Sequence, residues 1–186
     1  MLRCVFLTFG LLLLGATWAF AEAPGPVPEE LLLRRQEAQL LHRRLDLSGL
    51  RVLRKNEFVP AQVPVGRLVL VHLWAIECRP CVEELPALQG FFSAQAKDPR
   101  VKLLLVSETK DKATLLSFLS QRRGFFPNVD LYQNAQDSVR GSVQNFAQPL
   151  TLLLDERGVI HQAFVGTLRA RRGELVDAVN RYFSSL

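Results

Sequence analysis

Two cysteines three positions apart, Cys78 and Cys81, are the residues of this 186-residue chain whose type and spacing point most directly to chemistry. Such a pair suits thiol–disulfide exchange, in which a thiolate attacks a disulfide, or half of a tetrahedral zinc site. Zinc needs two further ligands, and the three histidines, His42, His72 and His161, lie far apart without a second paired spacing. The pattern therefore favours thiol–disulfide exchange, and we expect no metal.

The cysteines lie where a buried strand gives way to a helix. Residues 68–74 are a nearly continuous apolar run, typical of a strand buried on both faces of a sheet. From Val82 onward the apolar residues recur at helical spacing, so the cysteine pair opens a helix. The first N–H groups of a helix lack internal partners and favour negative charge, which would stabilise a thiolate at Cys78. We therefore predict Cys78 as the nucleophile and Cys81, one turn further on, as the resolving thiol.

This motif and its neighbours resemble a known active-site signature. The resemblance is to thioredoxin-like proteins of the exported TlpA/ResA branch, over residues 67–186. It implies a thioredoxin fold, an α/β fold with a central mixed sheet flanked by helices. It also implies thiol–disulfide exchange outside the cytoplasm, often as a reductant in cytochrome c or copper-centre assembly. The matching residues are Trp74-Ala75, Cys78-Arg79-Pro80-Cys81, Glu84, Pro86 and Leu88.

The resemblance also suggests roles for two ionisable residues near the cysteines. In the family, a glutamate at the position of Glu84 lies near the cysteines and helps their proton transfers; the alternative is an exposed acid in the first helical turn. His72 stands mid-strand, where thioredoxins have a buried Asp and TlpA-like proteins often an Asn. It could exchange the proton of Cys81, because histidine titrates near neutrality, or it could be a satisfied core histidine.

A second stretch, Gln148-Pro149, opens another buried apolar run. In thioredoxin-like proteins the matching proline is cis and faces the cysteine pair, so we expect a cis bond before Pro149. The backbone of Gln148 would then pair with an extended substrate. Trp74, at the end of the strand before the motif, is a further candidate for substrate contact.

Two charged residues beside the cysteines are expected to shift the pKa of the Cys78 thiol. The family usually has a Trp immediately before the first cysteine, and this chain has Glu77. A nearby negative charge raises the pKa of a thiol, while Arg79 acts in the opposite direction. A higher thiol pKa makes the dithiol more reducing, which favours a reductant over an oxidant.

The rest of the pattern predicts a thioredoxin-like domain at residues 47–186. A strand, the motif helix and a second strand imply a right-handed crossover and a parallel pair. The turn at 155–158 predicts that the last two strands form an antiparallel hairpin. Strands are expected at 50–54 (a short edge strand), 68–74, 101–107, 129–132, 150–155 and 159–165, and helices after the motif and at 109–123, 137–145 and 173–183.

Two segments precede this domain. Residues 1–21 are predicted to be a signal peptide, with Arg3, an apolar core and a cleavage site before Glu22; an uncleaved membrane anchor is the alternative. Residues 22–46 are predicted to be a linker followed by an amphipathic helix. Its leucine stripe could pack on the domain, dimerise or dock a partner, and packing is the commonest outcome. The stripe consists of Leu33, Leu40 and Leu47.

Charge and composition narrow the function further. The net charge of +5 falls to +4 when Arg3 leaves with the signal peptide, and the arginines are scattered in pairs without interleaved aromatics. This pattern does not favour nucleic-acid binding. We expect an oxidoreductase exported to the bacterial periplasm, with disulfide-containing client proteins and a membrane or exported thiol reductase as electron donor. A redox-active Cys78–Cys81 disulfide would be its only redox group. The alternative to an oxidoreductase is a non-enzymatic metallochaperone that holds Cu(I) with the same two cysteines.

Overall fold

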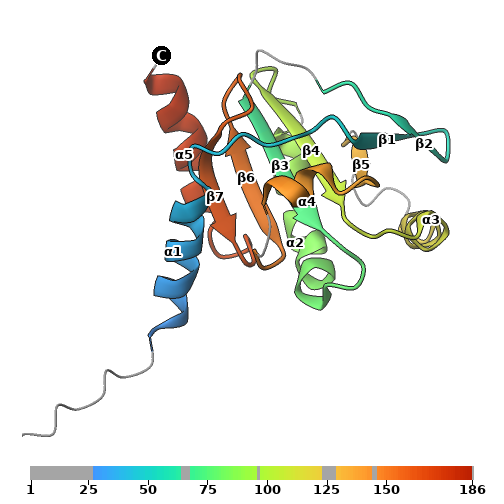
Figure 1. Ribbon diagram of the computed structural model, residues 1–186, viewed down its shortest axis with the longest axis horizontal. Helices are drawn as coiled ribbons and strands as arrows, with labels where there is room; N and C mark the ends of the chain where they lie inside the picture. Colours follow the sequence, from blue (N-terminus) through green and yellow to red (C-terminus); the bar gives the residue numbers. More distant parts are fainter. Residues whose placement is uncertain (1–26, 64–67, 96, 123–128, 144–145, 186) are drawn as a thin grey trace, which may run out of the picture.

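The computed structural model describes residues 27–63, 68–95, 97–122, 129–143 and 146–185, so the predicted signal peptide at 1–21 lies outside the described residues. The strands form one seven-stranded mixed sheet in the order β2-β1-β5-β4-β3-β6-β7 (Figure 1). The strands are β1 (Leu50–Arg54), β2 (Glu57–Pro60), β3 (Leu68–Trp74), β4 (Val101–Ser107), β5 (Leu131–Asn134), β6 (Leu150–Leu154) and β7 (Ile160–Val165). The helices are α1 (Glu29–Leu40), α2 (Arg79–Gln95), α3 (Lys112–Ser120), α4 (Ser138–Ser142) and α5 (Arg172–Ser184).

The central strand β3 is buried along its whole length, as its apolar run predicts. It pairs in parallel with β4 and antiparallel with β6. The connection from β3 to β4 runs through α2, so the predicted strand–helix–strand unit is confirmed. The predicted antiparallel pairing of β6 with β7 is confirmed as well. The chain thus has the expected α/β architecture with a mixed sheet flanked by helices.

Alternate residues of β3 enter two different cores, one on each face of the sheet. Val69, Val71 and Leu73 pack into a core that also contains residues of α1 and α4. Leu68, Leu70 and Trp74 enter the other core, with apolar residues of α2, α3 and α5. Because side chains alternate along a strand, His72 points to this second face, toward α2. The sheet therefore places His72 beside the helix that carries the cysteines.

The β1–β2 hairpin differs from the prediction. The strand at 50–54 is not at the edge, because it pairs with β2 on one side and β5 on the other. Strand β2, which the sequence pattern does not predict, lies at this edge of the sheet. The turn between them uses Lys55 and Asn56, with φ of 46° and 69°, a conformation suited to tight hairpins. Pro60 ends the edge strand, where its missing N–H is tolerated.

Helix α3 begins later than the predicted residue 109. The Asp111 carboxylate accepts the N–H groups of Ala113 and Thr114, and this N-cap fixes the start of the helix at Lys112. Helix α3 ends at Ser120 and α4 at Ser142, before the predicted ends at 123 and 145, and residues 123 and 144–145 themselves lie outside the described residues. Residue 109 instead belongs to the loop that follows β4.

Helix α1 ends at Leu40, earlier than predicted, and lies against β7 (Figure 1). Leu40 is fully buried, and Leu33 and Leu47 are partly buried against the same core. The expectation that the leucine stripe packs on its own domain is therefore confirmed. Within the described ranges, no helix combines the length and the apolar character that crossing a membrane requires.

Candidate active site

Cys78 and Cys81 form a disulfide at the start of α2, with an S–S distance of 2.06 Å. Cys81 is fully buried, whereas Cys78 is partly exposed. The backbone N–H of Cys81 donates to Sγ of Cys78 over 3.3 Å. A helix N–H that has no partner within the helix therefore faces the outer sulfur. Of the two sulfurs, a partner protein can therefore reach that of Cys78, where the helix also favours negative charge.

The predicted cis bond between Gln148 and Pro149 is present. Strands β3 and β6 are antiparallel and pair Leu73 with Leu150. Pro149, the residue before Leu150, therefore lies next to Trp74, at the end of β3 that leads into the motif. Pro149 is buried and its carbonyl accepts the N–H of Gly166 over 2.9 Å. The cis-proline loop and the cysteine pair thus lie at the same end of the sheet.

His72 is completely buried in β3. Its Nδ1 lies 2.9 Å from Oγ1 of Thr151 on β6, and its ring lies 5.0 Å from that of Phe92 on α2. Burial lowers its pKa to about 3, because the charged imidazolium would lose its hydration. The imidazole is therefore neutral at physiological pH.

Glu84 is also buried, with 3% of its surface exposed, which excludes the exposed-acid alternative. Its Oε2 accepts the N–H of Leu168 over 2.8 Å. Burial raises its pKa to about 7, and hydrogen bonds from the backbone of Leu168 and Arg169 oppose that rise. A carboxyl group with this pKa can both take and release a proton near neutral pH.

The two buried groups face each other. Nε2 of His72 lies 3.7 Å from Oε1 of Glu84, and neither atom has a hydrogen-bond partner among the residues that the structure describes. In the neutral tautomer whose Nδ1–H donates to Oγ1 of Thr151, Nε2 is an acceptor, and a protonated Glu84 carboxyl can donate toward it. Glu84 follows Cys81 by three residues on α2, so the two side chains share one helix face. The site therefore contains a buried carboxyl group on the helix face of Cys81, three residues after it.

The charged residues next to the cysteines each have a partner. The Thr109 hydroxyl donates to Oε2 of Glu77 over 2.9 Å, and its oxygen accepts the N–H of Ile76, also over 2.9 Å. Arg79 pairs with Glu83 over 2.6 Å, and this carboxylate raises the pKa of the guanidinium. Thr109, 1% exposed, thereby fixes the loop that precedes the first cysteine.

Trp74 is 1% exposed and packs on Phe118, with ring centroids 5.6 Å apart. We therefore assign it to the core beneath the site rather than to the contact with a substrate. A cleft of about 210 Å³ beside the start of α2 is formed by residues of this helix and of the loop after β7. Its lining residues are Pro80, Glu83, Glu84, Thr167 and Arg169.

Sequence reasoning missed Thr109 and the loop residue Leu168. The topology gives one signal for Thr109, because the ends of adjacent parallel strands meet at one sheet edge. For Leu168 the sequence offers no comparable signal. Among the described residues, no group of three or more His, Cys, Asp or Glu side chains is placed to hold a metal ion.

No family model matches the chain. It is similar to sporulation thiol-disulfide oxidoreductase A of Bacillus subtilis, with 27% identity over 110 residues, 58% of this chain and 64% of that protein. It is also similar to the thiol-disulfide oxidoreductase ResA of Geobacillus kaustophilus, with 27% identity over 103 residues, 55% of this chain and 57% of that protein. The chain thus spans less than two thirds of the length of these relatives, both of which are named thiol-disulfide oxidoreductases.

Solved structures show the fold. StoA from Bacillus subtilis aligns with a TM-score of 0.57 and 20% identity, over 72% of this chain and 98% of that one. A thioredoxin-like protein in its oxidized form aligns with the same TM-score of 0.57 and 17% identity, over 79% of this chain and 98% of that one. The chain therefore has a thioredoxin-like fold, as its motif predicts.

Proposed function

We propose that this protein is an exported thiol–disulfide oxidoreductase that reduces disulfides of client proteins through Cys78 and Cys81. The observation that carries the proposal is the pair of sulfurs at the helix start, one reachable and one buried, joined in a disulfide. Relatives that are named thiol-disulfide oxidoreductases support it over a little more than half of the chain. Export is proposed from the signal-peptide pattern of residues 1–21, with the bacterial periplasm as destination.

The reaction transfers two electrons to the client. The thiolate of reduced Cys78 attacks one client sulfur, forming a mixed disulfide and releasing the other client sulfur as a thiolate that takes up a proton. The thiolate of Cys81 then attacks Sγ of Cys78 and releases the second client thiolate. The protein is left with its Cys78–Cys81 disulfide, the state seen in the structure.

Cys81 must lose its proton before it attacks, and its surroundings are apolar. We assign the proton to Glu84, because this carboxyl lies on the same helix face and has a pKa of about 7. His72 stays neutral, and its Nε2 is placed to accept from the protonated carboxyl. In this assignment His72 supports the proton exchange of Glu84 and does not itself become charged.

We infer the direction of electron flow from the residue before the pair. Glu77 precedes Cys78 in the sequence, and a carboxylate near a thiol disfavours the thiolate and makes the couple more reducing, whereas Arg79 acts in the opposite direction. A membrane or exported thiol reductase would return the disulfide to the dithiol, and no metal or organic cofactor is needed. The clients, by resemblance, are proteins of cytochrome c or copper-centre assembly.

Reduction of insulin disulfides by the prereduced protein tests the activity. The Cys78→Ser variant should lose turnover, whereas the control Val52→Ala, which leaves both cysteines in place, should retain it. Turnover by Cys78→Ser would refute the assignment. A parallel Cu(I) titration distinguishes the metallochaperone alternative, which predicts tight copper binding without turnover.

Two further measurements identify the client proteins and the direction of electron flow. A Cys81→Ala variant cannot resolve the mixed disulfide, so clients should stay covalently attached to Cys78 and can be identified by mass spectrometry. Equilibration with glutathione gives the reduction potential. A strongly oxidising value would contradict the assignment as a reductant.

A further inference from the structure

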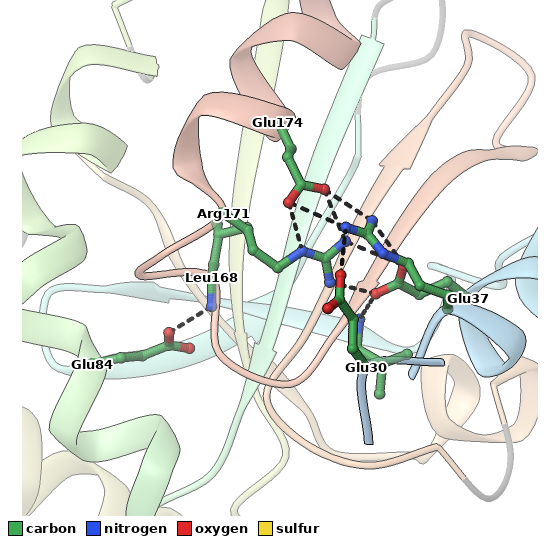
Figure 2. A network of polar contacts seen from close by, with 8 residues as sticks. Glu30, Glu37, Glu84, Leu168, Arg171 and Glu174 are labelled. Carbon is green, nitrogen blue, oxygen red and sulfur yellow. Dashed lines mark hydrogen bonds and ion pairs between the residues drawn. The ribbon is translucent and has the colours of Figure 1, made fainter. Parts of the chain in front are cut away.

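One carboxylate of the first helix holds both ends of a loop near the dithiol. Glu37 on α1 accepts the N–H of Val165 over 2.9 Å and the guanidinium of Arg171 over 2.6 and 3.2 Å. Val165 ends β7 and Arg171 immediately precedes α5. The residues between them, 166–170, therefore form a loop whose two ends are both bonded to Glu37; Figure 2 shows Arg171, at the second end, beside Glu37.

Burial makes this anchor costly to break. The side chains of Glu37 and Arg171 are 5% and 17% exposed, so neither charge has full access to water. Arg171 also donates to Glu174 over 3.2 and 3.1 Å, and its guanidinium lies over the ring of Phe164. Removing either partner of a buried pair leaves the other charge poorly satisfied, which is destabilising.

The anchored loop reaches the active site through its backbone. Leu168, fully buried, donates its N–H to Oε2 of Glu84 over 2.8 Å, and its carbonyl accepts the N–H of Arg171 over 2.9 Å. At the start of the loop, Gly166 donates its N–H to the carbonyl of Pro149. Figure 2 shows Leu168 between Glu84 on one side and the charged cluster on the other.

We propose that Glu37 and Arg171 are positioning residues for the dithiol: by anchoring the loop 166–170 from α1, they keep the N–H of Leu168 on the carboxyl of Glu84. The inference rests on the proposed function, in which Glu84 exchanges the proton of Cys81. According to this inference, α1, which lies outside the Cys-x-x-Cys motif, influences the pKa of Glu84.

The direction of the effect follows from the groups that face Glu84. These are His72 from β3 and the backbone N–H groups of Leu168 and Arg169 from the loop. Cys81 precedes Glu84 by three residues on the same helix face, and the side chains of Glu83 and Arg169 line the same cleft as Glu84. The two N–H groups stabilise the ionised carboxylate and oppose the effect of burial. A loosened loop weakens these bonds, so the carboxyl should hold its proton to higher pH.

The test is a titration of the Glu84 carboxyl by carbon-13 NMR in the oxidised full-length chain, where the two cysteines do not titrate. The Glu84→Gln variant assigns the resonance. We expect Glu37→Gln and Arg171→Gln to raise the midpoint by roughly 0.5–1 pH unit, the scale of losing a hydrogen bond to a carboxylate. Arg171→Lys, which keeps the charge but loses the two-pronged contact, should give a smaller rise.

The matched control is Val52→Ala, which removes buried volume in β1 and leaves the anchor intact. It should lower stability without moving the midpoint. An unchanged midpoint in folded Glu37→Gln and Arg171→Gln, or an equal rise in Val52→Ala, would overturn the proposal. Should the two glutamine variants not fold, Arg171→Lys decides, and its unchanged midpoint counts against the proposal.

This readout is separate from turnover. If insulin reduction fails while the midpoint still moves, the proposed function is wrong and the positioning contact stands. If turnover is present and the midpoint does not move, only the positioning role is lost.

Discussion

Replacing Glu84 by glutamine should make the folded protein more stable at alkaline pH. The substitution removes an ionisable group that burial makes costly to charge, and it preserves the shape of the side chain. The glutamine carbonyl can still accept the N–H of Leu168, and its amide can donate toward Nε2 of His72. The change therefore isolates the ionisation of one buried carboxyl.

The magnitude follows from the pKa of Glu84, which burial raises from 4.5 to about 7. Between these values the folded state binds more protons than the unfolded state, so the free energy of unfolding falls as the pH rises. The fall is complete above the folded-state pKa and amounts to about 3 kcal/mol, at about 1.4 kcal/mol per pH unit. The Glu84→Gln variant lacks this contribution at every pH.

Urea denaturation of the oxidised proteins at pH 4.5 to 8.5 measures the effect, because the disulfide-bonded cysteines do not titrate. The difference in unfolding free energy between variant and wild type removes the contribution of His72, which both proteins share. We expect this difference to grow by about 3 kcal/mol in favour of the variant from pH 4.5 to 8. A difference that stays constant with pH would refute the raised pKa and, with it, the assignment of Glu84 as proton acceptor.

Three further predictions concern the elements that hold the site. Asp111→Ala should lower the free energy of unfolding by about 1 kcal/mol, measured in urea, because its carboxylate caps α3. Leu40→Ala should lower it by about 2–5 kcal/mol in the same assay, because the side chain is fully buried between α1 and the sheet. The rate of thiol alkylation of the reduced protein should change with a midpoint near pH 7, where Glu84 ionises, and His72→Asn should leave this midpoint in place because His72 is neutral there; loss of the midpoint would assign the ionisation to His72 instead.

The sequence predicts best those strands and helices whose own residue pattern indicates how they are buried. Strands β3 and β4 agree with their predicted bounds because both are nearly continuous apolar runs, buried almost throughout in the sheet centre. Strand β2 was missed because Pro60 resembles a breaker and because the turn at Lys55 and Asn56 depends on two positive φ angles. The pairing of β1 with β5, which places Leu50 opposite Asn134 and moves β1 away from the edge, is a long-range contact that leaves no local pattern in the sequence.

The same distinction holds for the site. The cysteine pair, Glu84 and His72 lie within one short stretch, so a single motif indicates all of them. The contact between Glu37 and Arg171 joins residues 134 positions apart. Such a contact leaves no spacing signal in one sequence, since it depends on how α1 and α5 meet at the sheet edge.

The location of Glu37 has a practical consequence for anyone who trims this protein to its redox unit. A shortened version beginning at residue 47 would keep every residue of the Cys-x-x-Cys motif and of the cis-proline loop. It would nevertheless expose the core that Leu40 covers and leave the guanidinium of Arg171 without its main acceptor. Recombinant versions intended for assay should therefore begin ahead of Glu29, where α1 starts.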